Sequence, residues 1–146
     1  MFFRKKLLSP VDDTRLIKAI QLAELQTSGE IRVHIEKQLK GDVITATKNK
    51  FAELNMHQTK DRNGILFYLA IDSKSFAVWG DEGIHQKVGN SFWKEEAVIL
   101  KNHLQNDAIT EGVCEVVTSI GLKLKDLFPD DTEGSNQLSD KPVYGK

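Results

Sequence analysis

Acidic and amide side chains stand in two short polar stretches on either side of an apolar segment. Asp61 and Asn63 precede this segment, and Asp81 and Glu82 follow it. Carboxylate and amide oxygens are the ligands that hard cations such as Ca²⁺ and Mg²⁺ take in proteins. Paired carboxylates are also the groups that general acid and base catalysis uses. The residue types therefore indicate cation binding or metal-assisted hydrolysis, provided that the fold brings both stretches together.

The segment between the two stretches has the pattern of a β-hairpin. Residues 64–71 (GILFYLAI) are continuously apolar, which predicts a strand covered on both faces. Residues 72–75 supply turn chemistry, and residues 76–80 run back as a second strand. In an antiparallel hairpin the start of the first strand lies beside the end of the second. We therefore expect residues 61–63 to lie next to residues 80–82.

An earlier strand adds a third acidic position to this rim. Residues 30–36 alternate between polar and apolar types, which predicts a strand with one buried and one wetter face. A helix is predicted over residues 43–55. A strand, a helix and another strand favour a right-handed crossover with the two strands parallel. Glu30, the first residue of the earlier strand, then lies at the same sheet end as Asp61.

Ordinary structural roles compete with cation binding for these residues. Asp81 can cap a helix that follows it, and Asp61 can fix a turn or pair with Arg62. The loop at Asp61 is not an EF-hand, because Ile65 stands where another acid is required. The loop at Asp81 is not a phosphate-binding loop, because no Gly-Lys-Ser/Thr follows it. The pattern alone leaves both kinds of role open.

Histidine, cysteine and tryptophan give weaker indications. His57 and His85 flank the acidic loops and could ligate a metal or carry a proton, or have ordinary surface roles. Cys114 lies in an apolar helical run and is interpreted as a small buried hydrophobe. Trp79 and Trp93 are interpreted as core or rim aromatics. No nucleophile elbow or cysteine phosphatase loop is present, so covalent hydrolysis is not indicated.

Helical spacing of apolar residues predicts the remaining elements. They are a helix from Ser9 that stops near Gly29, a short helix over residues 84–88 that ends at Gly89, a helix over residues 90–105, and a last helix capped by Asp107 and ended by Pro129. The chain is thus divided into an N-terminal segment over residues 1–8, one domain over residues 9–129, and a flexible polar tail over residues 130–146.

The composition excludes several classes of protein. With 146 residues, 40% of them hydrophobic and 28% charged, the chain can bury a core. A formal net charge of −1 gives no general attraction to nucleic acid. No apolar run reaches the ~20 residues of a membrane span, and the N-terminus lacks the apolar region of a secretory signal. We therefore expect a cytoplasmic monomer without a nucleic-acid partner.

Three motifs, found in this order, resemble the TPM domain family. They are TSGEIRV at residues 27–33, NMHQTKDRNGIL at residues 55–66 and GDEGIH at residues 80–85. The helix that contains Phe92 and Trp93 and the helix before Pro129 also fit the family. The resemblance covers about residues 8 to 130, and the motifs in order make it fairly specific.

The resemblance implies a fold and a site. The fold is a three-layer α/β/α sandwich with a mixed sheet of about four strands. The site binds a divalent cation, usually suggested to be calcium, at loops matching Asp61 and Asp81. Asn63, Glu82 and Glu30 would be ligands or would support them. Acid phosphatase activity is ascribed to plant relatives. Relatives often carry a signal peptide and a membrane anchor, and this sequence shows neither.

Three hypotheses about function follow from the residues and the resemblance. The first is a domain that binds a divalent cation, Ca²⁺ or another such as Mg²⁺, at the acidic loops. The second is a metal-assisted acid phosphatase, with Glu82 or His85 as a proton carrier. The third is an interaction module without catalysis, in which the acidic loops or the tail dock an unidentified protein partner.

Overall fold

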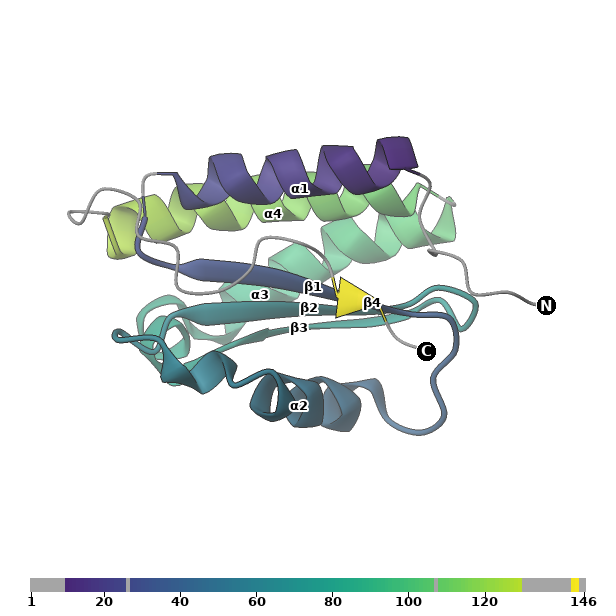
Figure 1. Ribbon diagram of the computed structural model, residues 1–146, viewed down its shortest axis with the longest axis horizontal. Helices are drawn as coiled ribbons and strands as arrows, with labels where there is room; N and C mark the ends of the chain where they lie inside the picture. The colour runs from purple at the N-terminus through teal and green to yellow at the C-terminus, as the bar shows by residue number, and fades with distance from the viewer. Residues whose placement is uncertain (1–9, 26, 107, 130–142, 145–146) are drawn as a thin grey trace.

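A mixed β-sheet forms the middle of three layers (Figure 1). The structure is a computed structural model that describes residues 10–25, 27–106, 108–129 and 143–144. Helices α1 (Pro10–Glu24), α3 (Glu82–Gln105) and α4 (Ile109–Leu127) cover one face of the sheet. Helix α2 (Val43–Glu53) and the short 3₁₀ helix η1 (Met56–Gln58) cover the other. This is the α/β/α sandwich that the resemblance to the TPM domain family implies.

The strands follow the order β3-β2-β1-β4 across the sheet. Strands β1 (Glu30–Glu36) and β2 (Gly64–Ala70) are parallel, with Glu30 opposite Gly64. Strands β2 and β3 (Ser75–Gly80) are antiparallel, with Ile65 opposite Gly80. Strand β4 (Val143–Tyr144) is only two residues long and lies parallel to β1. The parallel crossover and the hairpin are therefore both confirmed.

The core lies mainly between the sheet and the layer of three helices. Every residue of β2 is buried, as the unbroken apolar run predicts. In β1, Ile31, Val33 and Ile35 all face this core, which confirms the predicted alternation. A smaller cluster of Phe51, Met56 and Leu66 fills the space under α2. Both faces of the central strand are thus covered, and the loops at the strand ends are held by a rigid sheet.

The other face of β1 differs from the wetter surface that the alternation predicts. His34 is only 1% exposed, and its ring centroid lies 5.0 Å from that of Tyr68. Its Nε2 atom lies 3.2 Å from the Glu36 carboxylate. Helix α2 lies on this side of the sheet, where Glu30 and His34 are buried and Arg32 and Glu36 are half-buried. Burial lowers the pKa of His34 and raises the pKa of Tyr68.

Helix ends follow the sequence predictions in part. Helix α1 ends at Glu24, before the Gly29 that was expected to stop it. Helix α3 is broken at Gly89, whose φ of +73° interrupts the helix where the sequence predicts a break. The N-cap residue of α4 is Ala108, and the predicted cap Asp107 lies outside the described residues. Residues 1–9, which include the predicted cap Ser9, and residues 130–142 of the predicted tail also lie outside them.

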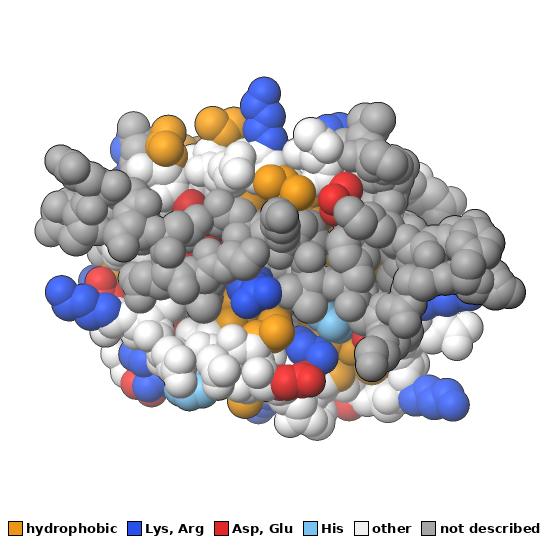
Figure 2. All heavy atoms as spheres, viewed as in Figure 1, with side chains coloured by type: hydrophobic (Ala, Val, Ile, Leu, Met, Phe, Trp, Pro, Cys, Tyr) orange, Lys and Arg blue, Asp and Glu red, His pale blue; other side chains and the backbone are white. Residues whose placement is uncertain are grey.

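Charged side chains of both signs are interspersed on the face seen in Figure 2, where the described residues form it. This agrees with the formal net charge of −1. Within the described part of the chain, no helix combines the length and the apolar character needed to cross a bilayer.

Candidate functional site

Two loops meet at one end of the sheet, where β2 begins and β3 ends. We call residues 61–63 and 81–83, together with Ser28, the loop corner. The amide of Asp81 donates to the carbonyl of Gly64 at 2.9 Å, and the amide of Gly83 donates to the carbonyl of Arg62 at 2.9 Å. A Cβ atom at Gly83 would clash with the carbonyl oxygens of Asp61 and Arg62. The loops therefore touch through their backbones, because position 83 has no side chain.

The centre of the loop corner is a bidentate ion pair between Arg62 and Asp81. Arg62 Nε lies 2.7 Å from Asp81 Oδ2, and Arg62 Nη2 lies 2.9 Å from Asp81 Oδ1. Such forked pairs fix the relative orientation of both side chains. The Asp81 side chain is 6% exposed and that of Arg62 is 42% exposed. The hydrogen bond to Asp81 raises the pKa of Arg62 further above its ordinary value.

Asp81 also caps helix α3. The amide of Glu82 donates to Asp81 Oδ1 at 2.8 Å, and the amides of Ile84 and His85 donate to the Asp81 carbonyl at 3.0 Å. The capping role considered for Asp81 from the sequence is thus present. The sequence suggested a pair between Asp61 and Arg62, but Arg62 pairs with Asp81 instead. Both carboxylate oxygens of Asp81 are engaged by groups of the protein itself.

Asp61 and Asn63 lie on the other side of the corner, beside Ser28. The Ser28 hydroxyl donates to Asp61 Oδ2 at 3.4 Å and accepts from Asn63 Nδ2 at 3.1 Å. Asn63 is 1% exposed, and its Oδ1 atom accepts no hydrogen bond from any described residue. A buried carbonyl oxygen without a donor is costly unless another group satisfies it. Asp61 is exposed, so its carboxylate is open to solvent.

Glu30 and Glu82 complete the set of predicted site residues. Glu30 is 2% exposed at the start of β1, and its amide donates to the Asn63 carbonyl at 3.3 Å. The Glu82 side chain is 62% exposed, and its Oε1 atom lies 3.3 Å from Arg62 Nη1. The fold therefore brings all five positions to one end of the sheet. Among the described residues, however, no three acidic, histidine or cysteine side chains are grouped so as to hold a metal ion.

Only one side of the loop corner offers oxygen atoms of the kind that a divalent cation binds. Asp61, Ser28 and Asn63 offer a carboxylate, a hydroxyl and an orphaned amide oxygen, which are oxygen ligands of the type that Ca²⁺ takes. Asp81 and Glu82 instead neutralise a guanidinium cation. Ser28 was given no role from the sequence. Its position just before β1, at the same sheet end as the two loops, is the feature of the sequence that could have indicated it.

A cavity of about 670 Å³ adjoins the loop corner, between α2, α3 and β3. Its lining includes Arg62, Asp81 and Glu82 from the corner, and also His57 and His85. Trp79 and Trp93 also line this cavity. Of the core and rim positions that the sequence suggested for these tryptophans, this is a rim position. The sequence places His57 and His85 beside the acidic loops but does not indicate a cavity.

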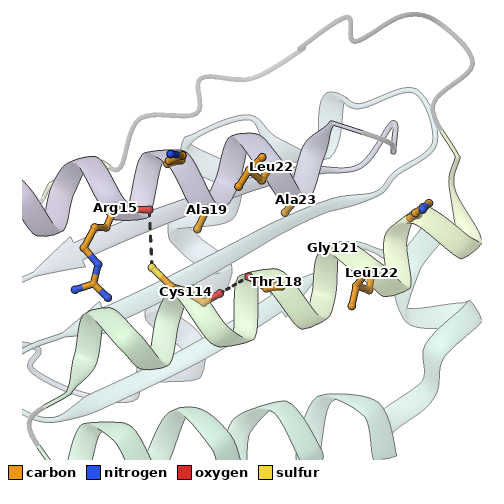
Figure 3. A pocket seen from close by; sticks show the side chains of 10 residues that line it. Arg15, Ala19, Leu22, Ala23, Cys114, Thr118, Gly121 and Leu122 are labelled. Atoms are coloured by element: carbon orange, nitrogen blue, oxygen red, sulfur yellow. Dashed lines mark hydrogen bonds between the residues drawn. The ribbon is translucent and has the colours of Figure 1, made fainter.

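A second cavity, of about 410 Å³, lies between α1 and α4 (Figure 3). Small residues bring these helices together, since a Cβ atom at Gly121 would come within 2.6 Å of the Ala23 Cβ. Cys114 is half-buried there, with its Sγ atom 3.9 Å from the Arg15 carbonyl oxygen. Burial raises the pKa of the Cys114 thiol, which keeps it protonated. We assign no chemistry to this cavity.

Comparisons with known proteins agree with this architecture. A family model described as TPM domain matches residues 2–122. The NMR structure of the BA42 protein from the psychrophilic bacterium Bizionia argentinensis is similar, with a TM-score of 0.90 and 30% identity over 99% of this chain and 100% of that one. The comparison with curated protein sequences gave no significant match.

Two further structures share the fold at lower identity. The N-terminal domain of a P. gingivalis protein has a TM-score of 0.70 and 16% identity, over 82% of this chain and 78% of that one. The N-terminal domain of the cg2496 protein from Corynebacterium glutamicum has a TM-score of 0.65 and 16% identity, over 91% of this chain and 81% of that one. These two likenesses support the fold alone.

Proposed function

The chain belongs to the TPM domain family, and from this premise and the geometry of the loop corner we propose that it binds a divalent cation. Calcium is the cation that we propose first, with Mg²⁺ as the alternative. Asp61 supplies the charged ligand and Asn63 supplies its amide oxygen. The supporting observation is the buried Oδ1 atom of Asn63, which accepts no hydrogen bond from the described residues and lies in the same corner as Asp61.

The other predicted ligands take different parts in this proposal. Glu30 is buried at the start of β1 and is linked to the corner by the hydrogen bond from its amide to the Asn63 carbonyl. Asp81 holds Arg62, which fixes the two loops to each other. Glu82 is the exposed partner of the same guanidinium. The preformed corner lowers the entropic cost of gathering the oxygen ligands, and the cation stabilises the folded state by linkage.

The experiment is a thermal unfolding series of the full chain with added CaCl₂ or MgCl₂. At a free cation concentration roughly a hundred times the dissociation constant, the free energy of unfolding should rise by about 2.7 kcal/mol. Asp61→Asn should abolish most of this rise. Asp72→Asn, in the turn between β2 and β3, is the matched control and should keep it. An equal rise in both variants would reject the corner as the site.

Phosphomonoester hydrolysis is the second candidate, and one observation favours it. Arg62, His57 and His85 line the cavity beside the corner, where a guanidinium could contact a phosphoryl group and an imidazole could carry a proton. A chromogenic phosphomonoester assay with Ca²⁺, Mg²⁺ or Mn²⁺ tests it. Activity that survives Asp61→Ala combined with Asp81→Ala, in protein shown to be folded by circular dichroism, would reject a catalytic role for the corner.

A further inference from the structure

The 670 Å³ cavity follows the outer edge of strand β3. Four consecutive residues of this strand, from Ala77 to Gly80, line it. Successive side chains of a strand point to opposite faces of the sheet, so four in a row can line one cavity only where it runs along the strand's edge. Helices α2 and α3 form its two walls. We call this cavity the β3 groove.

The backbone of β3 offers unpaired hydrogen-bonding groups to the groove. Strand β3 is the last strand of the sheet, and no other described strand pairs with its outer edge. The bond from the Asp81 amide to the Gly64 carbonyl fixes the alternation of the antiparallel ladder. Ala77 and Trp79 therefore bond to β2, whereas Val78 and Gly80 direct their N–H and C=O groups outward. Groups at this spacing recognise another extended main chain.

Strand β3 lacks the features that usually protect a sheet edge. Its sequence, SFAVWG, contains no proline and no charged residue. The opposite edge of the sheet is treated differently, because β4 pairs there with β1 through two residues of the chain's own C-terminal part. A short added strand thus completes the sheet on one side, whereas no strand of the described residues pairs with the outer edge of β3.

The side chains of the groove indicate what such a strand must carry. Phe51 and Trp79 form an apolar wall on the α2 side, and Trp93 stands on the α3 side. The ring of Trp93 occupies the space next to Gly80, where a Cβ atom would lie 2.8 Å from its Cη2 atom. At the Gly80 end the groove is acidic, because the two carboxylates of Asp81 and Glu82 share the single guanidinium of Arg62, which leaves one negative charge in excess among these three groups.

We propose that the β3 groove binds an extended peptide segment of a partner protein, which adds to the edge of β3 as a further strand. An apolar or aromatic side chain of the segment packs between Trp79 and Trp93, and a Lys or Arg residue lies at the Glu82 end. This is recognition by strand addition, in which main-chain hydrogen bonds hold the segment and the flanking pockets select its side chains. The proposal does not depend on cation binding at the loop corner.

The test begins with selection of peptides from a random seven-residue phage library against the full-length protein. The selected peptide, made synthetically, is then titrated into ¹⁵N-labelled protein. The amides of Val78 and Gly80 should shift, and the selected sequences should pair an apolar residue with Lys or Arg. Replacement of Glu82 by Lys should weaken binding of these peptides. Failure to select any binder, or shifts that lie away from β3, would overturn the proposal.

Two matched changes test the strand pairing itself. Val78→Pro removes an outward N–H, which an edge strand tolerates, and should weaken binding about tenfold through the loss of one main-chain bond. Val78→Thr keeps the N–H and should bind normally. If Val78→Pro does not fold, N-methylation of alternate peptide amides gives the same test from the other side. Peptide binding that neither Val78→Pro nor N-methylation weakens would contradict strand addition. Dimers of this chain that Val78→Pro abolishes would show that a second copy, and not a peptide of a partner protein, occupies the groove.

Discussion

The two loops of the corner carry the same kinds of residue but use them in opposite ways. In the loop after β3, Asp81 is buried, and both its oxygens are engaged by Arg62 and by the first turn of α3. In the loop before β2, Asp61 is exposed, and its neighbour Asn63 keeps an amide oxygen without a donor among the described residues. One loop is closed by the protein's own groups, and the other offers oxygens that are not yet satisfied.

This difference shows that a cluster of acids is not equivalent to a ligand set. A carboxylate that already neutralises a guanidinium must lose that partner before it can bind a metal ion, whereas an open carboxylate pays only its own desolvation. The Asp81 loop therefore determines the shape of the corner, and the Asp61 loop is the one that offers open oxygens to the cation that we propose. The variants below test this division of roles, from the largest expected effect on stability to the smallest.

Contact between the loops depends most on Gly83. Gly83→Ala should destabilise the protein by about 3 kcal/mol, because the new Cβ meets the carbonyl oxygens of the facing loop. Urea unfolding measures this change. Gly41→Ala is the control, since Gly41 has a φ of +96° and open space around it. That variant should cost only about 1 kcal/mol for its backbone conformation. Equal costs would mean that close contact of the loops is unimportant.

Asp81 should matter for stability far more than Asp61. Asp81→Ala removes the helix cap and the partner of Arg62, and we expect a loss of about 2 kcal/mol. Asp61→Ala removes one long hydrogen bond at an exposed site and should cost less than about 0.5 kcal/mol. Asp81→Asn retains a capping oxygen and should fall between the two. If the two alanine variants were equally stable, the contrast between the loops would be wrong.

Buried His34 should make the stability of the protein fall in mild acid. Burial lowers the pKa of His34 in the folded state, so the unfolded chain binds its proton at a higher pH. Stability contributed by neutral His34 is present above the ordinary pKa of about 6.5 and is lost as the pH falls below it. Urea unfolding between pH 8 and pH 5 should show this decline. His34→Gln should flatten it.

The sequence predicts the scaffold of the corner better than its contacts. The apolar run of β2 and the alternation in β1 follow directly from which faces are covered, so the hairpin and the parallel crossover could be predicted. The partner of Arg62 could not, because the nearest acid in sequence is Asp61, and because the residue type does not indicate the left-handed φ of +52° that Arg62 adopts. Residue types alone do not determine which side chains a turn of this kind brings together.

The burial of side chains by helices that pack on the sheet was equally hard to predict from the sequence. His34 occupies a polar position of an alternating strand, which indicates solvent, yet its side chain is buried on the side of the sheet where α2 lies. The β3 groove likewise depends on the space left between α2 and α3 beside an edge strand. Trp79 and Trp93 carry the right chemistry in the sequence, but only the packing of the helices shows that they face one groove.

We propose that a cation binds at the open side of the corner, beside Asp61 and Asn63. The most direct measurement is a titration of ¹⁵N-labelled wild-type protein with CaCl₂, followed residue by residue by NMR up to millimolar concentration. We expect the largest shifts at Ser28, Asp61 and at the side-chain amide of Asn63, with smaller shifts at Glu82. No shift at millimolar calcium, or shifts confined to residues away from the two loops, would contradict the account.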